Sequence, residues 1–227
     1  MKNEAIFLGH LGLGDHIIQQ GIVNKLASQY RRVFIFCKHH NLGSVRYMCS
    51  PNVNIIPVAG DEDVHQLYPQ IKNADIISVG FYNENWEKLS ESEMSFDRYF
   101  YHQANLDFAT TYNVDLKDGK QWETVIELDP KEPFCFIHDD ASRGFGINMT
   151  KVNTVLPVVR PTITSDTIFD YLPLIRRASE IHCIDSSFVL MIDRANIKCD
   201  KKRVHRYIRN QNNSYSPFYT DEWEIIR

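Results

Sequence analysis

The stretch Gly9-His10-Leu11-Gly12-Leu13-Gly14-Asp15-His16 decides the fold, because it lies between an apolar run and a helical pattern. The run from Glu4 to Leu8 is typical of a buried parallel strand. From Asp15 to about Tyr30, apolar residues recur every fourth position, which predicts a helix. A strand, a glycine-rich turn and a helix in this order predict the start of a parallel α/β unit.

Strands and helices alternate along the rest of the chain. Further strands are expected at 33–37, 53–58, 76–79, 122–128, 134–138, 155–159, 181–184 and 203–208. Helices are expected at 64–71, 168–178 and 186–194, and an aromatic-rich, mostly helical connector at 81–118. The predicted fold class is therefore α/β, with two small Rossmann-like domains, residues 1–120 and 121–227, facing a central cleft.

Composition excludes several classes of protein. The formal net charge of -4 argues against a nucleic-acid partner that is held by bulk positive charge. No apolar run is long enough to span a membrane, and residues 1–8 do not resemble a signal peptide. The five cysteines are scattered and odd in number, without a C-x-x-C pair, which favours a reduced, cytoplasmic location.

The glycine-rich turn predicts an anion site with an additional acid. Gly12 and Gly14 let a ligand approach the backbone, and the helix start offers free N–H groups to a phosphate. The spacing is neither G-x-G-x-x-G nor a P-loop, and the carboxylate of Asp15 would repel a phosphate. Asp15 is either the helix N-cap or a general base for an attacking hydroxyl, and His10 and His16 could also act as the base.

A second polar turn follows the strand expected at 134–138. His138, Ser142 and Arg143 lie at the carboxyl end of that strand, where open α/β sheets bind their ligands. Arg143 could neutralise the charge that develops on a leaving phosphate. Alternatively, this is an ordinary surface loop in which Arg143 forms an ion pair with a neighbouring aspartate.

A third polar turn joins the strand at 181–184 to the next helix. Its residues Asp185, Ser186 and Ser187, with His182 in the strand before them, predict a second anion seat at a helix N-terminus. Helix capping by Asp185 or Ser186 is the simpler alternative.

Together these motifs resemble the two-Rossmann (GT-B) nucleotide-sugar glycosyltransferases, and most closely the ADP-heptose heptosyltransferase family. Leu13-Gly14-Asp15 matches the start of that family, whose proposed base then falls on Asp15. His138 and Arg143 stand near the family's His and basic residue, and the 185–187 turn is similar to its Asp-Ser/Thr-Gly turn. Three departures are Ser187 in place of Gly, Leu190 in place of an expected His, and a shorter chain.

The resemblance implies transfer of a sugar from a nucleotide diphosphate-sugar to a glycan or other hydroxyl acceptor. It further implies inversion at the anomeric carbon, a donor held mainly by the second domain, and no metal or separate cofactor. One alternative is a non-catalytic nucleotide-sugar-binding protein. Another is an S-adenosylmethionine-dependent methyltransferase, which would need an acid where Cys37, Lys38 and His39 follow the second strand.

Three further patterns have simpler explanations. Asp61-Glu62-Asp63 could bind a divalent metal, but acids at an expected helix start favour the helix dipole instead. The basic residues between 198 and 209 are read as a solvated edge or a rim near phosphates rather than a nucleic-acid surface. His39-His40 lacks a third ligand at a convincing spacing, so no metal site is predicted.

Overall fold

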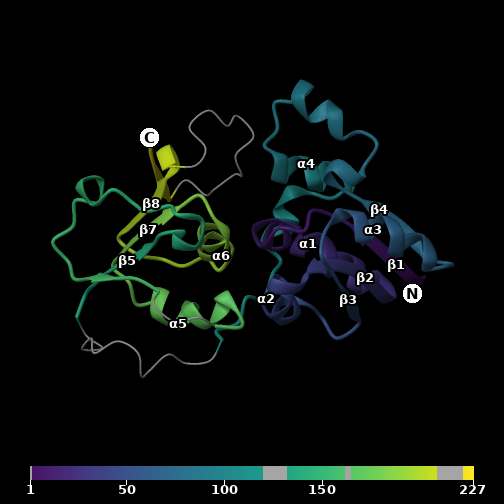
Figure 1. Ribbon diagram of the computed structural model, residues 1–227, viewed down its shortest axis with the longest axis horizontal. Helices are drawn as coiled ribbons and strands as arrows, with labels where there is room; N and C mark the ends of the chain where they lie inside the picture. The colour runs from purple at the N-terminus through teal and green to yellow at the C-terminus, as the bar shows by residue number, and fades with distance from the viewer. Residues whose placement is uncertain (1, 120–131, 162–164, 209–221) are drawn as a thin grey trace. The chain divides into compact units, whose positions relative to one another are not determined.

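A computed structural model of the chain describes residues 2–119, 132–161, 165–208 and 222–227 (Figure 1). Within these ranges the chain forms two compact units, one up to Asp115 and the other from Leu116. The predicted boundary at 120/121 and the strand expected at 122–128 lie outside the described residues, so both stay predictions.

The first unit is built on a four-stranded parallel sheet. Its strands are β1 (Lys2–Leu8), β2 (Tyr30–Lys38), β3 (Val53–Val58) and β4 (Asp75–Ser78). They lie in the order β3-β2-β1-β4, in which the direction of strand addition reverses between β1 and β4. This is the order of the first four strands of a Rossmann sheet, in which ligands bind at the carboxyl ends beside the reversal.

The helices of this unit are α1 (Leu13–Gln29), α2 (Leu42–Met48), α3 (Asp61–Leu67) and α4 (Phe96–Gln103). Short 3-10 turns occupy His39–Asn41, Tyr68–Gln70, Gly80–Tyr82, Trp86–Glu91 and Phe108–Tyr112. The expected helix at 64–71 begins earlier, with its three acids in its first turn, and ends before Pro69. The helix-start interpretation of the Asp61–Asp63 acids is thereby confirmed.

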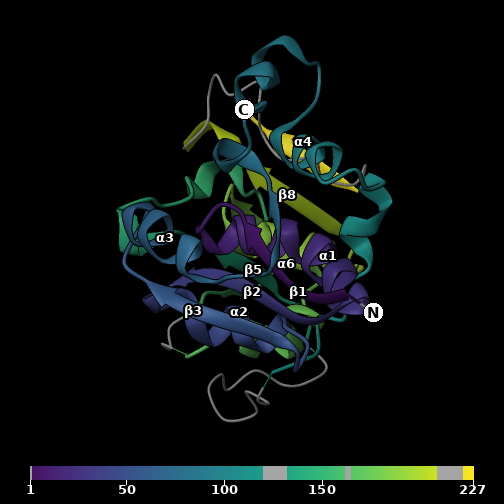
Figure 2. The ribbon, with the colours of Figure 1, turned by 90° about the vertical axis from the view of Figure 1, so that its right-hand side faces the viewer.

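The aromatic connector covers α1, as Figure 2 shows for α4 beside that helix. The Tyr101 hydroxyl donates a hydrogen bond of 2.7 Å to the Ile18 carbonyl oxygen, from a fully buried position. Because α1 is enclosed by the sheet on one side and the connector on another, it buries Gln19 and Gln20 as well as its isoleucines. The connector thus packs on α1, and its Tyr82 also packs against the core cluster that contains Ile6 and Leu8 of β1.

The second unit is built on a five-stranded parallel sheet in the order β6-β5-β7-β8-β9. Its strands are β5 (Cys135–His138), β6 (Val158–Val159), β7 (Glu180–Ile184), β8 (Lys201–His205) and β9 (Trp223–Ile226). This is the 2-1-3-4-5 order of doubly wound sheets, which reverses between β5 and β7. The expected strand at 203–208 ends at His205, where the 3-10 turn Arg206–Ile208 begins.

The helices of the second unit are short. They are α5 (Leu172–Ile175) and α6 (Ser187–Arg194), with 3-10 turns at Ala141–Arg143, Met149–Lys151 and Ile168–Tyr171. The helix expected at 168–178 is divided because Pro173 lacks an N–H and fits only near a helix start. None of the helices in the described part of the chain has the length and apolarity that a membrane crossing requires.

Candidate functional site

The glycine-rich turn lies at the carboxyl end of β1, beside the reversal of the first sheet. Helix α1 begins at Leu13, and its N-cap is Gly12, whose backbone is extended (φ -70°, ψ 146°). Asp15 is the third residue of the helix, beside Gly14, and not its N-cap. The capping interpretation of Asp15 is therefore wrong, and the carboxylate lies in the first turn, where the helix dipole favours a negative charge.

Gly12 is required for the position of that carboxylate. A Cβ atom on residue 12 would lie 2.5 Å from Asp15 Oδ2, well inside van der Waals contact. The backbone angles of Gly12 are open to any residue, so the constraint is space and not conformation. The half-buried carboxylate is thus folded back against the loop that follows β1.

His10 is held inside a cage of aromatic rings. Its ring stacks on Phe81 at 4.2 Å and meets Trp86 and Phe100 edge-on. His10 Nε2 accepts a hydrogen bond of 3.2 Å from the Phe81 backbone N–H. Burial lowers the pKa of His10 to about 4, and a ring nitrogen that already accepts a bond is a poor base.

His16 is also unsuited to the role of base. His16 is a buried residue of α1. Burial lowers its pKa to about 4, so the ring is neutral at neutral pH. The contacts of the two histidines leave Asp15 as the strongest candidate base in this turn.

Three residues that the sequence analysis did not identify fix the turn. Gln19 Nε2 donates to the His10 carbonyl oxygen and Asn41 Nδ2 donates to the Leu11 carbonyl oxygen, both at 3.2 Å. Gly80 has a left-handed backbone (φ +64°), and a Cβ there would collide with the His10 ring. These residues come from three separate segments, so only the folded sheet reveals that they converge.

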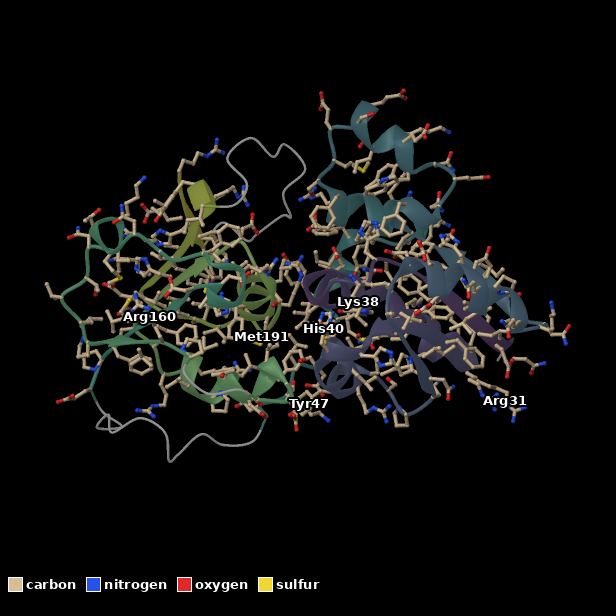
Figure 3. The ribbon with its side chains drawn as sticks, viewed as in Figure 1. Arg31, Lys38, His40, Tyr47, Arg160 and Met191 are labelled. Atoms are coloured by element: carbon tan, nitrogen blue, oxygen red, sulfur yellow. The ribbon has the colours of Figure 1, made fainter. Side chains whose placement is uncertain are left out.

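The carboxyl end of β2 carries basic residues and no acid. Lys38 is the last residue of β2, and His39 and His40 follow in a 3-10 turn. Figure 3 shows Lys38 and His40 at this end of the strand and Arg31 at the other. The ribose-binding acid that a methyltransferase needs is therefore missing from the end of β2.

In the second unit, the turns after β5 and β7 meet at the reversal of the sheet. Ser186 Oγ lies 3.3 Å from His138 Nδ1, and the His138 ring stacks on Phe188 with centroids 3.8 Å apart. Burial lowers the pKa of His138 to about 4, so this ring is a neutral hydrogen-bonding group at neutral pH. His138 and Ser186, which the sequence placed on separate motifs, are thus brought together.

Helix α6 begins directly at this turn. Its N-cap by position is Ser186, whose side chain makes no capping hydrogen bond, and its first residue is the half-buried Ser187. The Ser186 side chain therefore does not cap α6. The first-turn N–H groups together with the two hydroxyls form a seat suited to an anion.

Arg206 brings a guanidinium group beside this seat, paired with the Asp185 carboxylate. It is the first residue after β8, and its Nε lies 3.4 Å from Asp185 Oδ2, with both side chains largely buried. In the sequence, Arg206 belongs to the basic stretch between residues 198 and 209 and to the strand expected at 203–208. Its position could have identified it, because Arg206 follows the carboxyl end of β8 just as the polar turns follow β5 and β7.

Arg143 lies in the Ala141–Arg143 turn, which also contains Ser142. Its Nε is 2.5 Å from Asp140 Oδ2, and its side chain is half exposed. The ion pair with a neighbouring aspartate, expected as the alternative, is thus present. Asp139 instead pairs with Arg160 at 2.7 Å.

His182 is the central residue of β7 and is fully buried. Its Nδ1 lies 2.9 Å from His205 Nε2, within the sheet. The structure therefore places His182 inside the sheet, two residues before the carboxyl end of β7.

The comparisons with known proteins agree with this architecture. No protein-family model and no curated protein sequence matches the chain. Among solved structures, the chain is similar to a glycosyl transferase of family 9 from Veillonella parvula, with a TM-score of 0.60 and 10% identity over 99% of this chain and 86% of that one.

The chain is also similar to TibC, an iron-containing dodecameric glycosyltransferase from enterotoxigenic E. coli. The TM-score is 0.55 at 12% identity, and the match covers 98% of this chain and 62% of TibC. A second structure of TibC, described as a heptosyltransferase in complex with ADP-D-beta-D-heptose, is similar to this chain with a TM-score of 0.54. The chain thus has a glycosyltransferase family 9-like fold and spans about three fifths of the length of TibC.

Proposed function

We propose that this protein is a glycosyltransferase that moves a sugar from a nucleotide diphosphate-sugar to a hydroxyl acceptor. The observation that carries the proposal is the arrangement of the second sheet. A neutral imidazole, serine hydroxyls and two arginines, each paired with an aspartate, converge beside the strand reversal. The fold similarity to glycosyltransferases, one of them bound to ADP-heptose, supports the same reading.

The donor diphosphate would bind at the N-terminus of α6. The Ser186 and Ser187 hydroxyls and the helix N–H groups would donate to phosphate oxygens, and Arg206 would balance their charge. Arg143 would add a second positive group by exchanging Asp140 for the diphosphate. These donors would stabilise the leaving diphosphate without a catalytic metal.

The acceptor would react beside Asp15, across the cleft that the GT-B resemblance implies. The Asp15 carboxylate would take the proton of the acceptor hydroxyl as its oxygen forms a bond to the anomeric carbon. The bond from that carbon to the diphosphate oxygen would break, and the electron pair would leave with the nucleotide diphosphate. Attack opposite the leaving group inverts the anomeric configuration.

A thermal-shift screen would identify the donor class, because a ligand that binds only the folded chain raises its melting temperature. We expect nucleotide diphosphates and their sugars to stabilise the protein and S-adenosylmethionine to have no effect. Stabilisation by S-adenosylmethionine alone would contradict the proposal. Donor binding without hydrolysis or transfer would instead favour the non-catalytic nucleotide-sugar-binding protein.

The Asp15→Asn variant tests the catalytic role. We expect it to lose transfer while keeping donor affinity, because the amide cannot accept the proton and the donor binds elsewhere. Glu62→Gln is the matched control, since Glu62 is an exposed carboxylate in the first turn of α3 in the same unit. Normal turnover by Asp15→Asn would remove Asp15 from the mechanism.

A further inference from the structure

A second cluster of reactive side chains lies inside the second sheet, away from the candidate donor seat. Cys135, Glu180 and His182 each offer one ligand atom, and the three atoms lie within 4.8 Å of one another. Cys135 and His182 are fully buried, and Glu180 is partly buried.

The strand register explains why the three side chains meet. Cys135 and Glu180 are opposite one another in the parallel pair of β5 and β7, so their side chains share one face of the sheet. Glu180 and His182 are two residues apart in β7 and therefore also share that face. Neighbouring strands are only about 4.8 Å apart, which brings the sulfur, carboxylate and imidazole together.

Two polar atoms of the cluster are buried without a hydrogen bond. These are His182 Nε2 and Glu180 Oε2, which lie 3.8 Å apart. Buried polar atoms in native proteins are nearly always satisfied, so a pair of such atoms facing each other requires an explanation.

The surrounding residues hold the His182 and Glu180 side chains in the orientation of metal ligands. His205 occupies His182 Nδ1 at 2.9 Å, which leaves Nε2 facing the cluster. Lys201 donates to Glu180 Oε1 at 2.8 Å, and Thr154 lies beside both Glu180 and Cys135, while Glu180 Oε2 makes no hydrogen bond. Metal-binding histidines and carboxylates are typically oriented by such outer hydrogen bonds.

We propose that Cys135 Sγ, Glu180 Oε2 and His182 Nε2 bind one zinc ion inside the second unit. Thiolate, imidazole and carboxylate are the three ligand types that zinc takes from proteins. Zinc–ligand bonds of about 2.0–2.3 Å in a tetrahedron put ligand atoms roughly 3.3–3.8 Å apart, so only a small contraction is needed. A fourth position remains for a water molecule.

This zinc ion stabilises the sheet and takes no part in sugar transfer. Glu180 begins β7, whereas Asp185 follows its carboxyl end, and five residues of strand separate them by roughly 16 Å. The proposal is independent of the proposed function and compatible with metal-independent transfer. It departs from the sequence analysis, which predicted no metal site. Glu180 and His182 are close in sequence, but Cys135 joins them only through the pairing of β5 with β7.

The experiment uses the full chain, stripped of metal with a chelator and titrated with Co²⁺ and then Zn²⁺. We expect one ion per chain, a thiolate-to-cobalt charge-transfer absorption band, and a melting temperature that rises with Zn²⁺. Cys135→Ala should abolish the band and weaken Zn²⁺ affinity by more than about 100-fold. Cys183→Ala is the matched control, because Cys183 is equally buried in β7 and should retain both properties.

Absence of the band in the unmodified chain would overturn the proposal, and so would an unchanged band in Cys135→Ala. Binding through His39 and His40 would give a cobalt spectrum without the thiolate band, which also counts against it. If Cys135→Ala does not fold, Glu180→Gln keeps the shape of the side chain and should weaken Zn²⁺ binding. Unchanged affinity in that variant would refute the assignment.

Discussion

Gly12→Ala tests whether the Asp15 carboxylate must lie where the structure has it. The new methyl group would be 2.5 Å from Asp15 Oδ2, whereas ordinary contacts begin at 3.4 Å, so the carboxylate must move by about 0.9 Å. Displacement of a catalytic group by about 1 Å costs roughly 100-fold in rate, which corresponds to about 2.7 kcal/mol. The effect on stability is smaller, about 1 kcal/mol, because alanine is a poorer N-cap than glycine.

The matched control is Gly60→Ala. Gly60 is the N-cap of α3, its backbone is extended, and nothing lies within 4 Å of a Cβ built there. Both variants therefore lose a similar helix cap, but only Gly12→Ala displaces the Asp15 carboxylate. A comparison of kcat/KM with the free energy of unfolding in urea separates the two effects.

We expect kcat/KM to fall about 100-fold in Gly12→Ala and to stay unchanged in Gly60→Ala, with similar losses of stability in both. A folded Gly12→Ala protein that retains kcat/KM within about twofold would refute the reasoning. An equal loss of activity in Gly60→Ala would show that helix capping, and not the position of the carboxylate, controls the rate.

Three other predictions follow from the geometry. Arg206→Gln should weaken nucleotide diphosphate binding by about 10- to 100-fold in calorimetry, because a charge-assisted hydrogen bond contributes roughly 1.5–3 kcal/mol; an unchanged affinity would exclude Arg206 from the seat. Gly21→Ala should lower the free energy of unfolding by about 1–2 kcal/mol, because its Cβ would collide with the Thr110 carbonyl oxygen; an increase would show that helix propensity outweighs the clash. The free energy of unfolding should fall as pH drops from about 6.5 to about 4. Burial lowers the pKa of His16 in the folded protein to about 4, so the unfolded chain binds a proton at His16 at a higher pH than the folded chain does. His16→Gln should make this pH dependence shallower in urea titrations.

The sequence predicted the elements that local patterns control. The strand at 53–58 was predicted with its observed bounds, and the strand and helix on either side of the glycine-rich turn were predicted within two residues. These segments combine apolar runs or helical periodicity with clear glycine boundaries. By contrast, α2 and β9 are short and carry polar residues, so their patterns were too weak to identify.

The candidate site was only partly predictable because it depends on contacts across the sheet. Asp15 lies in the first turn of the helix that follows β1, and Ser186 lies in the turn between β7 and α6. These strand-to-helix positions gave the signal. Arg206 was missed because β8 ends one residue before it, and strand ends are poorly marked in sequence. His182 was assigned to the anion seat from its proximity in sequence, whereas the pleat of β7 directs it into the core beside His205.

The two sheets have different strand orders, yet each carries its polar turns beside its own reversal. In the first sheet the turn after β1 lies beside β4, and in the second the turns after β5 and β7 are adjacent. At such a reversal the connections leave toward opposite faces of the sheet, so the loops separate and open a crevice there. A short motif can therefore be functional without extended sequence similarity, because the topology supplies the opening and the motif supplies only the polar groups. The strand order, rather than the sequence, therefore places the polar turns, and a chain that shares only 10–12% identity with its structural neighbours can still share their fold.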